Sequence, residues 1–188
     1  MSFLPKNAGT GTDHSVLKRG IIANSATVAV GEAVGLNSTG YITNATAGEA
    51  MFGIVSGFSN KDGSPLSPSE YVAGTATQTD VQSVVADSDN VTVDKKMVIV
   101  ETSEDKVWSV NVNGTLGTTA DSPTATDGAI GGWIDTDSSG SNYARVLEST
   151  FTRTQTGDEN FFVWGIDPDD TTRYLVSIAN SLKKAGTH

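Results

Sequence analysis

Residues 20–58 read GIIANSATVAVGEAVGLNSTGYITNATAGEAMFGIVSGF, and this stretch decides the fold class. Its apolar residues come in short runs rich in Val and Ile, which suit a pleated, half-buried strand. Gly, Asn, Ser and Thr separate these runs and supply turn signals. We therefore expect short strands at 27–30, 33–36 and 51–58, with a turn at 37–40.

The remainder of the chain repeats this alternation of apolar runs and polar turns. Val107–Val112 alternates with period two, and the dipeptide Asn113–Gly114 that follows is typical of hairpin turns. The strongest hairpin prediction lies near the C-terminus, where two apolar runs flank Asp167–Asp170 and Pro168 suits the second position of a type I turn. Further β-type runs are found at 90–100, 129–134 and 143–147.

These runs predict an all-β fold, a sandwich or small barrel built from short antiparallel strands. Residues 1–19 contain few apolar side chains and several helix-opposing Pro and Gly, so an extended N-terminal arm is expected there. The body then covers 20–188, either as one unit or as two packed β units at 20–85 and 86–188. A chain of 188 residues can bury a core without covalent cross-links.

Composition narrows the classes of partner. The chain has 12 basic and 22 acidic side chains and a formal net charge of -10, which disfavours nucleic acid as a partner because phosphate contacts require Lys and Arg. No cysteine is present, so no disulfide is expected. No apolar run approaches the roughly 18 residues of a membrane helix, and the first residues lack the apolar core of a secretory signal. We therefore expect no membrane partner.

Groups able to do chemistry are few. Nucleophilic catalysis needs a Ser, Cys or Thr beside a base, yet the chain has no Cys and its two histidines, His14 and His188, lie near the ends. Residues 135–140 (DTDSSG) resemble the start of a calcium loop, but position 12, where a bidentate Glu is needed, is Val146. We interpret this segment as a β-turn. The prediction is a protein that is not an enzyme, with no cofactor and no metal.

Trp108, Trp133 and Trp164 each lie in a β-type run. Large aromatic side chains in such runs usually fill a core, which is the favoured interpretation here. The alternative is a platform on which sugar rings stack. Exposure of the three side chains separates these interpretations.

The segment 20–58 resembles the capsid decoration, or cement, proteins of tailed bacteriophages. The likeness lies in the V-x-V-G-x-x-V-G-L pattern at 28–36, in N-S-T-G-Y at 37–41 and in G-I-V-S-G at 53–57. The segment A-R-V-L-E-S-T-F at 144–151 has a similar character. The resemblance implies a head-stabilising virion protein, made in the host cytoplasm, that binds the outer capsid surface as a homotrimer and clamps neighbouring subunits of the major capsid protein.

Charge segregation suggests where such contacts lie. Residues 1–19 hold three basic side chains and one acidic one, and residues 173–188 hold three basic and none acidic, so the acidic excess belongs to the body between them. Basic tails on an acidic body suit an acidic partner surface; the other interpretation is that polar tails are simply solvated. The candidate capsid contacts are Phe3, Leu4, Pro5, Lys6, Lys18, Arg19, Lys183 and Lys184.

The rival hypothesis is a receptor- or glycan-binding β module, such as a fibre tip or an adhesin domain. Exposed tryptophans favour this rival, whereas buried tryptophans favour the capsid role. The sequence offers no catalytic or cofactor signature that would favour an enzyme over these two hypotheses.

Overall fold

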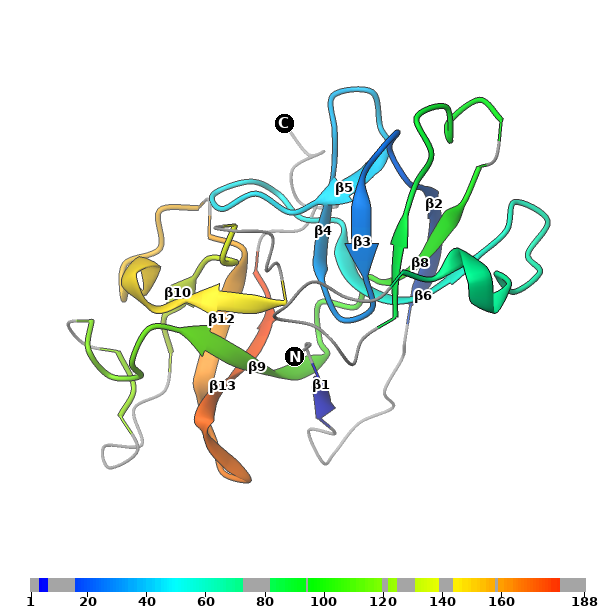
Figure 1. The fold of residues 1–188 in the computed structure, drawn as a ribbon. Coiled ribbons are helices and arrows are strands. Elements are labelled where there is room, and N and C mark those ends of the chain that lie inside the picture. The colour runs from blue at the N-terminus through cyan, green and yellow to red at the C-terminus, as the bar shows by residue number, and fades with distance from the viewer. Residues whose placement is uncertain are drawn as a thin grey trace.

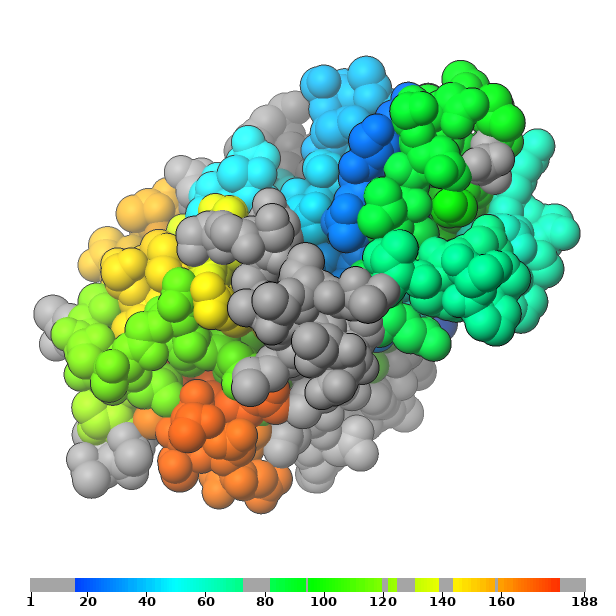
Figure 2. All heavy atoms as spheres, viewed as in Figure 1, coloured from blue at the N-terminus to red at the C-terminus, as the bar shows by residue number. Residues whose placement is uncertain are grey.

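The computed structural model describes residues 4–6, 16–72, 82–93, 95–119, 122–124, 131–138, 144–157 and 159–179. These residues form an all-β fold, as the sequence predicts, in which strands are joined by turns and by two short 3-10 segments, η1 (Pro68–Glu70) and η3 (Glu148–Thr150). Figure 1 shows two groups of strands, one containing β2–β8 and the other containing β9–β13. In the space-filling view they make an elongated body (Figure 2).

The first group is a five-stranded sheet in the order β2-β8-β6-β4-β5, covered by the two-stranded sheet β3-β7. All its strand pairs are antiparallel. A parallel bridge between Ile22 and Ile42 joins the two outer strands at one end, so the sheet is nearly closed into a barrel. The strands are β2 (Leu17–Ile21), β3 (Thr27–Ala29), β4 (Ala33–Leu36), β5 (Ile42–Asn44), β6 (Gly53–Ser59), β7 (Ser83–Val85) and β8 (Met97–Glu101).

The second group is a six-stranded sheet in the order β1-β9-β13-β12-β10, with β11 parallel to β9. Its longest pairing is the β12–β13 hairpin, which turns at Asp167–Asp170 as predicted. The strands are β1 (Leu4–Lys6), β9 (Val107–Asn113), β10 (Trp133–Ile134), β11 (Arg145–Leu147), β12 (Phe161–Asp167) and β13 (Asp170–Ile178).

The described residues form two apolar cores, and strands β4 and β6 contribute to both. Val34 and Val55 point into the barrel with Ile22, whereas the neighbouring Ala33 and Ile54 pack against side chains of the second sheet. Successive side chains of a strand point to opposite faces, so one wall can serve two cores. The shared wall therefore joins the two groups of strands into one packed body.

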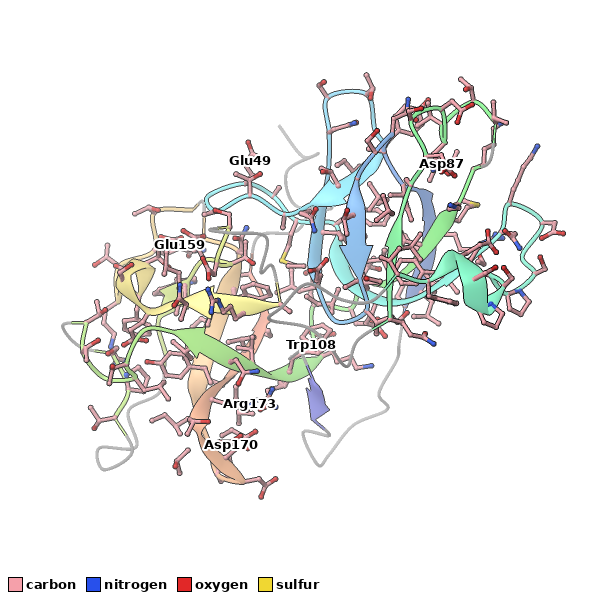
Figure 3. All side chains as sticks on the ribbon, in the orientation of Figure 1. Glu49, Asp87, Trp108, Glu159, Asp170 and Arg173 are labelled. Carbon is pink, nitrogen blue, oxygen red and sulfur yellow. The ribbon has the colours of Figure 1, made fainter. Side chains whose placement is uncertain are left out.

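Polar contacts reinforce this junction. The buried Asn160 side chain donates from Nδ2 to the backbone carbonyls of Glu49 at 2.6 Å and of Thr46 at 3.4 Å, and its Oδ1 accepts from the Thr136 amide at 3.0 Å. Asp135 accepts from the amides of Gly48 and Asn160. Figure 3 shows Glu49 on the loop that leaves β5 and reaches the side of the second sheet where Glu159 lies. These hydrogen bonds satisfy backbone groups that apolar packing alone would leave unpaired.

Several boundaries differ from the sequence-based expectations. The predicted arm ends between residues 19 and 20, but strand β2 runs through this limit. The predicted division between residues 85 and 86 would separate β8 from β2 and β6, the two strands with which it pairs. The change from one sheet to the other instead occurs between Glu101 and Val107. Alternating apolar residues reveal that a segment is a strand but do not identify its neighbours, which are chosen by long-range pairing.

Two local expectations were wrong for related reasons. Asn113–Gly114 does not form a hairpin, because β9 pairs with β13 on one side and with β1 and β11 on the other. In the block 90–100, the strand begins only at Met97; before it, the amides of Thr92 and Val93 donate to the Asp89 carbonyl in a turn. The Asn90 side chain supports this turn by accepting from the Lys96 amide.

Glu159, beside the junction, has a pKa below its usual value. Burial raises the pKa, but the Glu159 carboxylate accepts from the Thr156 amide and hydroxyl and from the Gly157 amide, and together these hydrogen bonds outweigh burial. Since the folded-state pKa lies below the unfolded one, the carboxylate stabilises the fold above the unfolded pKa, and this contribution is lost as the pH falls through the folded pKa.

We expect Glu159→Gln to reduce stability near pH 7 and to have a smaller effect as the pH falls through the lowered pKa of the wild-type carboxyl, because that carboxyl then becomes protonated too. Chemical denaturation of both proteins across this range measures the difference. A constant difference between them at every pH would contradict the assignment.

Candidate functional site

At the exposed edge of the first sheet, the start of β2 presents apolar and basic side chains next to one another. Strand β2 pairs with β8 along Leu17–Ile21, and its bridge to β5 begins only at Ile22. Leu17 is 57% exposed and the preceding Val16 is 39% exposed, so two adjacent apolar side chains face solvent here. Lys18 is also exposed. We call residues 16–18 the β2 edge.

The start of this edge is held in place by the end of β8. The Val16 amide donates to Glu101 Oε1 and to Ser103 Oγ, both at 2.9 Å, while the Val16 carbonyl accepts from the Thr102 amide. Glu101 is buried and also pairs with Lys106 at 3.3 Å. The backbone at the edge is therefore positioned by buried polar contacts, although its side chains face solvent.

Lys18 and Arg19, both predicted contacts, behave differently. Arg19 Nη2 donates to Ser59 Oγ at 3.0 Å and to the Asn60 carbonyl at 2.7 Å, so its guanidinium fastens β2 to the turn after β6. The Lys18 side chain makes no hydrogen bond or ion pair with any other residue that the structure describes. Of these two cations, Lys18 is the one available to a partner.

Of the remaining predicted contacts, the three that the structure describes belong to the second sheet. The backbone of Leu4, Pro5 and Lys6 forms β1, which pairs with Ser109, Trp108 and Val107 at the border of the second sheet. Phe3, Lys183 and Lys184 lie outside the described residues. Sequence reasoning missed Val16 and Leu17; their position directly before Lys18–Arg19, without the alternation of a buried strand, is the signal that could have found them.

The two described carboxylates of the calcium-like segment, Asp135 and Asp137, accept hydrogen bonds from other residues of the chain. Asp137 is fully buried and accepts hydrogen bonds from Arg145 Nε and, at 3.0 Å, from Asn113 Nδ2. Asp135 accepts from the amides of Gly48 and Asn160, where the two groups of strands meet. Val146, at position 12 of the segment, is buried in the second core. Within the described part of the chain, no group of three or more His, Asp or Glu side chains could hold a metal ion.

A second buried carboxylate secures the turn after β9. Glu148 Oε2 accepts from the Tyr174 hydroxyl at 2.9 Å, and Glu148 Oε1 accepts from the Gly117 amide at 3.1 Å. Burial is the main cause that raises the Tyr174 pKa, and the hydrogen bond to Glu148 adds to it. This network fixes a turn and leaves the phenol protonated, so it is structural.

The three tryptophans divide between the two interpretations. Trp108 is 2% exposed and lies in the second core, as favoured from the sequence. Trp164 is 47% exposed, and Trp133 is half-buried. Thus one tryptophan meets the condition for a core residue and another meets the condition set for the rival hypothesis.

No helix among the described residues has the length and apolarity needed to span a membrane. Comparison with protein-family models, with curated protein sequences and with solved structures finds no match. The chemistry of the surface must therefore carry the functional argument.

Proposed function

We propose that this protein is a structural virion protein that binds the outer surface of an icosahedral phage capsid and stabilises it by contacting neighbouring major capsid protein subunits. The observation that carries the proposal is the β2 edge, where Val16, Leu17 and Lys18 are exposed on an otherwise acidic chain. The resemblance of residues 20–58 to capsid decoration proteins supports the same conclusion.

The β2 edge offers a partner three kinds of interaction. Burial of Val16 and Leu17 supplies apolar contact, Lys18 attracts acidic side chains, and the backbone of β2 can pair with an added strand along the side not used by β8. A ligand that binds only the assembled shell stabilises that shell by mass action. A homotrimer would strengthen the effect, because binding of one subunit raises the effective concentration of the others.

The test is co-sedimentation of the purified protein with mature, undecorated capsids. Saturable binding at a fixed ratio to the major capsid protein supports the proposal, and the ratio identifies the symmetry position. Absence of saturable binding would overturn it.

Lys18→Glu should weaken capsid binding about tenfold, which corresponds to about 1.4 kcal/mol, because the reversed charge faces the acidic partner. The matched control is Lys95→Glu, which makes the same change of charge in the turn before β8. Lys18 lies opposite Val100, near the end of β8, so the control is at the other end of the β2–β8 pair. Equal losses for both variants would show that net charge, and not the β2 edge, determines binding. Circular dichroism checks that both variants keep the wild-type fold.

A further inference from the structure

A group of aromatic side chains lies on one face of the second sheet. This face points away from the apolar core that the second sheet forms with Ala33 and Ile54. Phe161 and Val163 of β12 belong to that core, so the alternating Phe162 points to the opposite face. Trp133 is the Cα partner of Phe162 across the β10–β12 pair and therefore shares its face. Trp164 lies on this face too, since its Nε1 donates to Ser177 Oγ at 3.0 Å.

The three rings form a continuous series. Trp133 and Phe162 have ring centroids 5.5 Å apart with an interplanar angle of 77°, and Phe162 and Trp164 are 4.9 Å apart at 76°. Edge-to-face contacts of this kind are favourable and hold the rings in fixed orientations. We call Trp133, Phe162 and Trp164 the aromatic ladder.

Trp164 is the exposed end of the ladder. A buried or half-buried indole usually turns its N–H toward a partner, and here the partner is Ser177, a buried side chain of the adjacent strand. The polar atom of the indole therefore points inward, while almost half of the residue is left open to solvent. A register shift between Val163 and Gly165 places Trp164 at a β-bulge, a device that changes the direction of a side chain next to a site.

Polar groups occupy the neighbouring strands of the same face. Arg173, Leu175 and Ser177 of β13 alternate with the core residues, and Asn111 of β9 is the Cα partner of Arg173. Asn111 Oδ1 accepts from Arg173 Nε at 3.3 Å, but its buried Nδ2 atom has no hydrogen-bond partner. An unpaired buried amide donor costs stability, but because this Nδ2 atom is buried it is not open to a ligand on the surface.

We propose that this face binds a neutral glycan, with Trp164 stacking against a hexopyranose ring and with Phe162 and Trp133 fixing the position of Trp164. A neutral sugar ring presents an apolar C–H face, which suits the exposed indole of Trp164. An anionic glycan fits less well, because Asp170 lies 3.8 Å from the Arg173 guanidinium and the whole chain is acidic. Figure 3 shows Asp170 and Arg173 together at one end of β13.

This site is separate from the β2 edge and adds to the capsid-binding role. The ladder belongs to β10 and β12 in the second sheet, whereas the edge belongs to the first. Capsid co-sedimentation and glycan binding can therefore succeed or fail independently, and substitution of Trp164 should leave capsid binding unchanged.

The experiment is a titration of the full chain with cellohexaose, chitohexaose and maltohexaose, followed by tryptophan fluorescence and by calorimetry. We expect a saturable change in fluorescence with at least one of these neutral oligosaccharides. Trp164→Ala should weaken binding at least tenfold, while Trp164→Phe, which keeps an aromatic face, should lose less. The control Trp108→Phe removes a buried fluorophore of the core and should keep both the affinity and the signal from Trp164.

Two results would overturn the proposal. One is the absence of saturable binding to all three oligosaccharides, or binding that Trp164→Ala leaves unaltered. The other is a change of oligomeric state in Trp164→Ala, measured by analytical ultracentrifugation, which would show that the ladder is covered by a second copy of the chain. Retention of the wild-type circular dichroism spectrum by Trp164→Ala ensures that a loss of binding is not a loss of folding.

Discussion

Replacing Gly53 by alanine is expected to destabilise the protein by about 3 kcal/mol, at the upper end of the usual cost of overpacking. A Cβ atom at Gly53 would lie 2.2 Å from the Glu101 carbonyl oxygen and 2.7 Å from Val100 Cγ1. The carbonyl belongs to β8, which is held by β2 on one side and β6 on the other, so it cannot move away cheaply. Thermal and chemical denaturation measure the loss.

The matched control lies on the same strand. At Gly57 the nearest atom to an added Cβ is Ile99 Cδ1 at 3.9 Å, an ordinary van der Waals separation. Gly57→Ala should therefore change stability by less than about 1 kcal/mol. Similar losses for the two variants would contradict the explanation by close approach and would indicate a general intolerance of alanine in β6.

The second large effect is expected for Asn160→Asp, a substitution that hardly changes the shape of the side chain. The amide group that donates to the Glu49 and Thr46 carbonyls would become a carboxylate oxygen facing them. Asn160 is fully buried, so the new charge would be neither solvated nor paired. We expect a loss of about 3–5 kcal/mol near neutral pH, the range found when a buried charge is left uncompensated.

This loss should depend on pH. Burial raises the pKa of the introduced carboxyl, and its protonated form can donate a hydrogen bond to one of the two carbonyls. The destabilisation is therefore greatest above that raised pKa and decreases as the pH falls through it. Denaturation curves collected at several pH values test this sign.

Asn37→Asp is the control for the same chemical change. Asn37 Oδ1 accepts from the amides of Thr39 and Tyr41 and from the Thr39 hydroxyl, at an exposed turn. A carboxylate keeps all three acceptor contacts, so stability should be retained. If Asn160→Asp were equally harmless, the polar junction would not hold the two groups of strands together.

The two β-type runs at 27–36 were predictable, but their partners were not. Thr27–Ala29 and Ala33–Leu36 are strands, as their sequence indicates, yet β3 pairs with β7 while β4 pairs with β5 and β6. The signal for a strand is local, whereas the choice of partner depends on which pairings bury the most apolar surface across the whole chain. The same argument explains why Asn113–Gly114, a strong local hairpin signal, ends a strand without forming a hairpin.

The candidate sites divide in the same way. Lys18 and Trp164 could be named from the sequence, because a basic residue near a terminus and a tryptophan in a β-type run are visible in one dimension. Their roles could not be assigned, since Arg19, next to Lys18, is used internally, and Trp108, another tryptophan in a β-type run, is buried. Only neighbours brought from distant segments decide which side chain remains available.

The sequence by itself determined the all-β class, the acidic character and most strand positions, because apolar alternation, composition and turn residues act over a few neighbouring positions. The tertiary structure decided that one barrel wall serves two cores, that β8 belongs with β2 and β6, and which face carries the aromatic ladder. These features arise from pairing between segments far apart in the chain. Such pairing is governed by the packing of the complete molecule, which no local pattern contains.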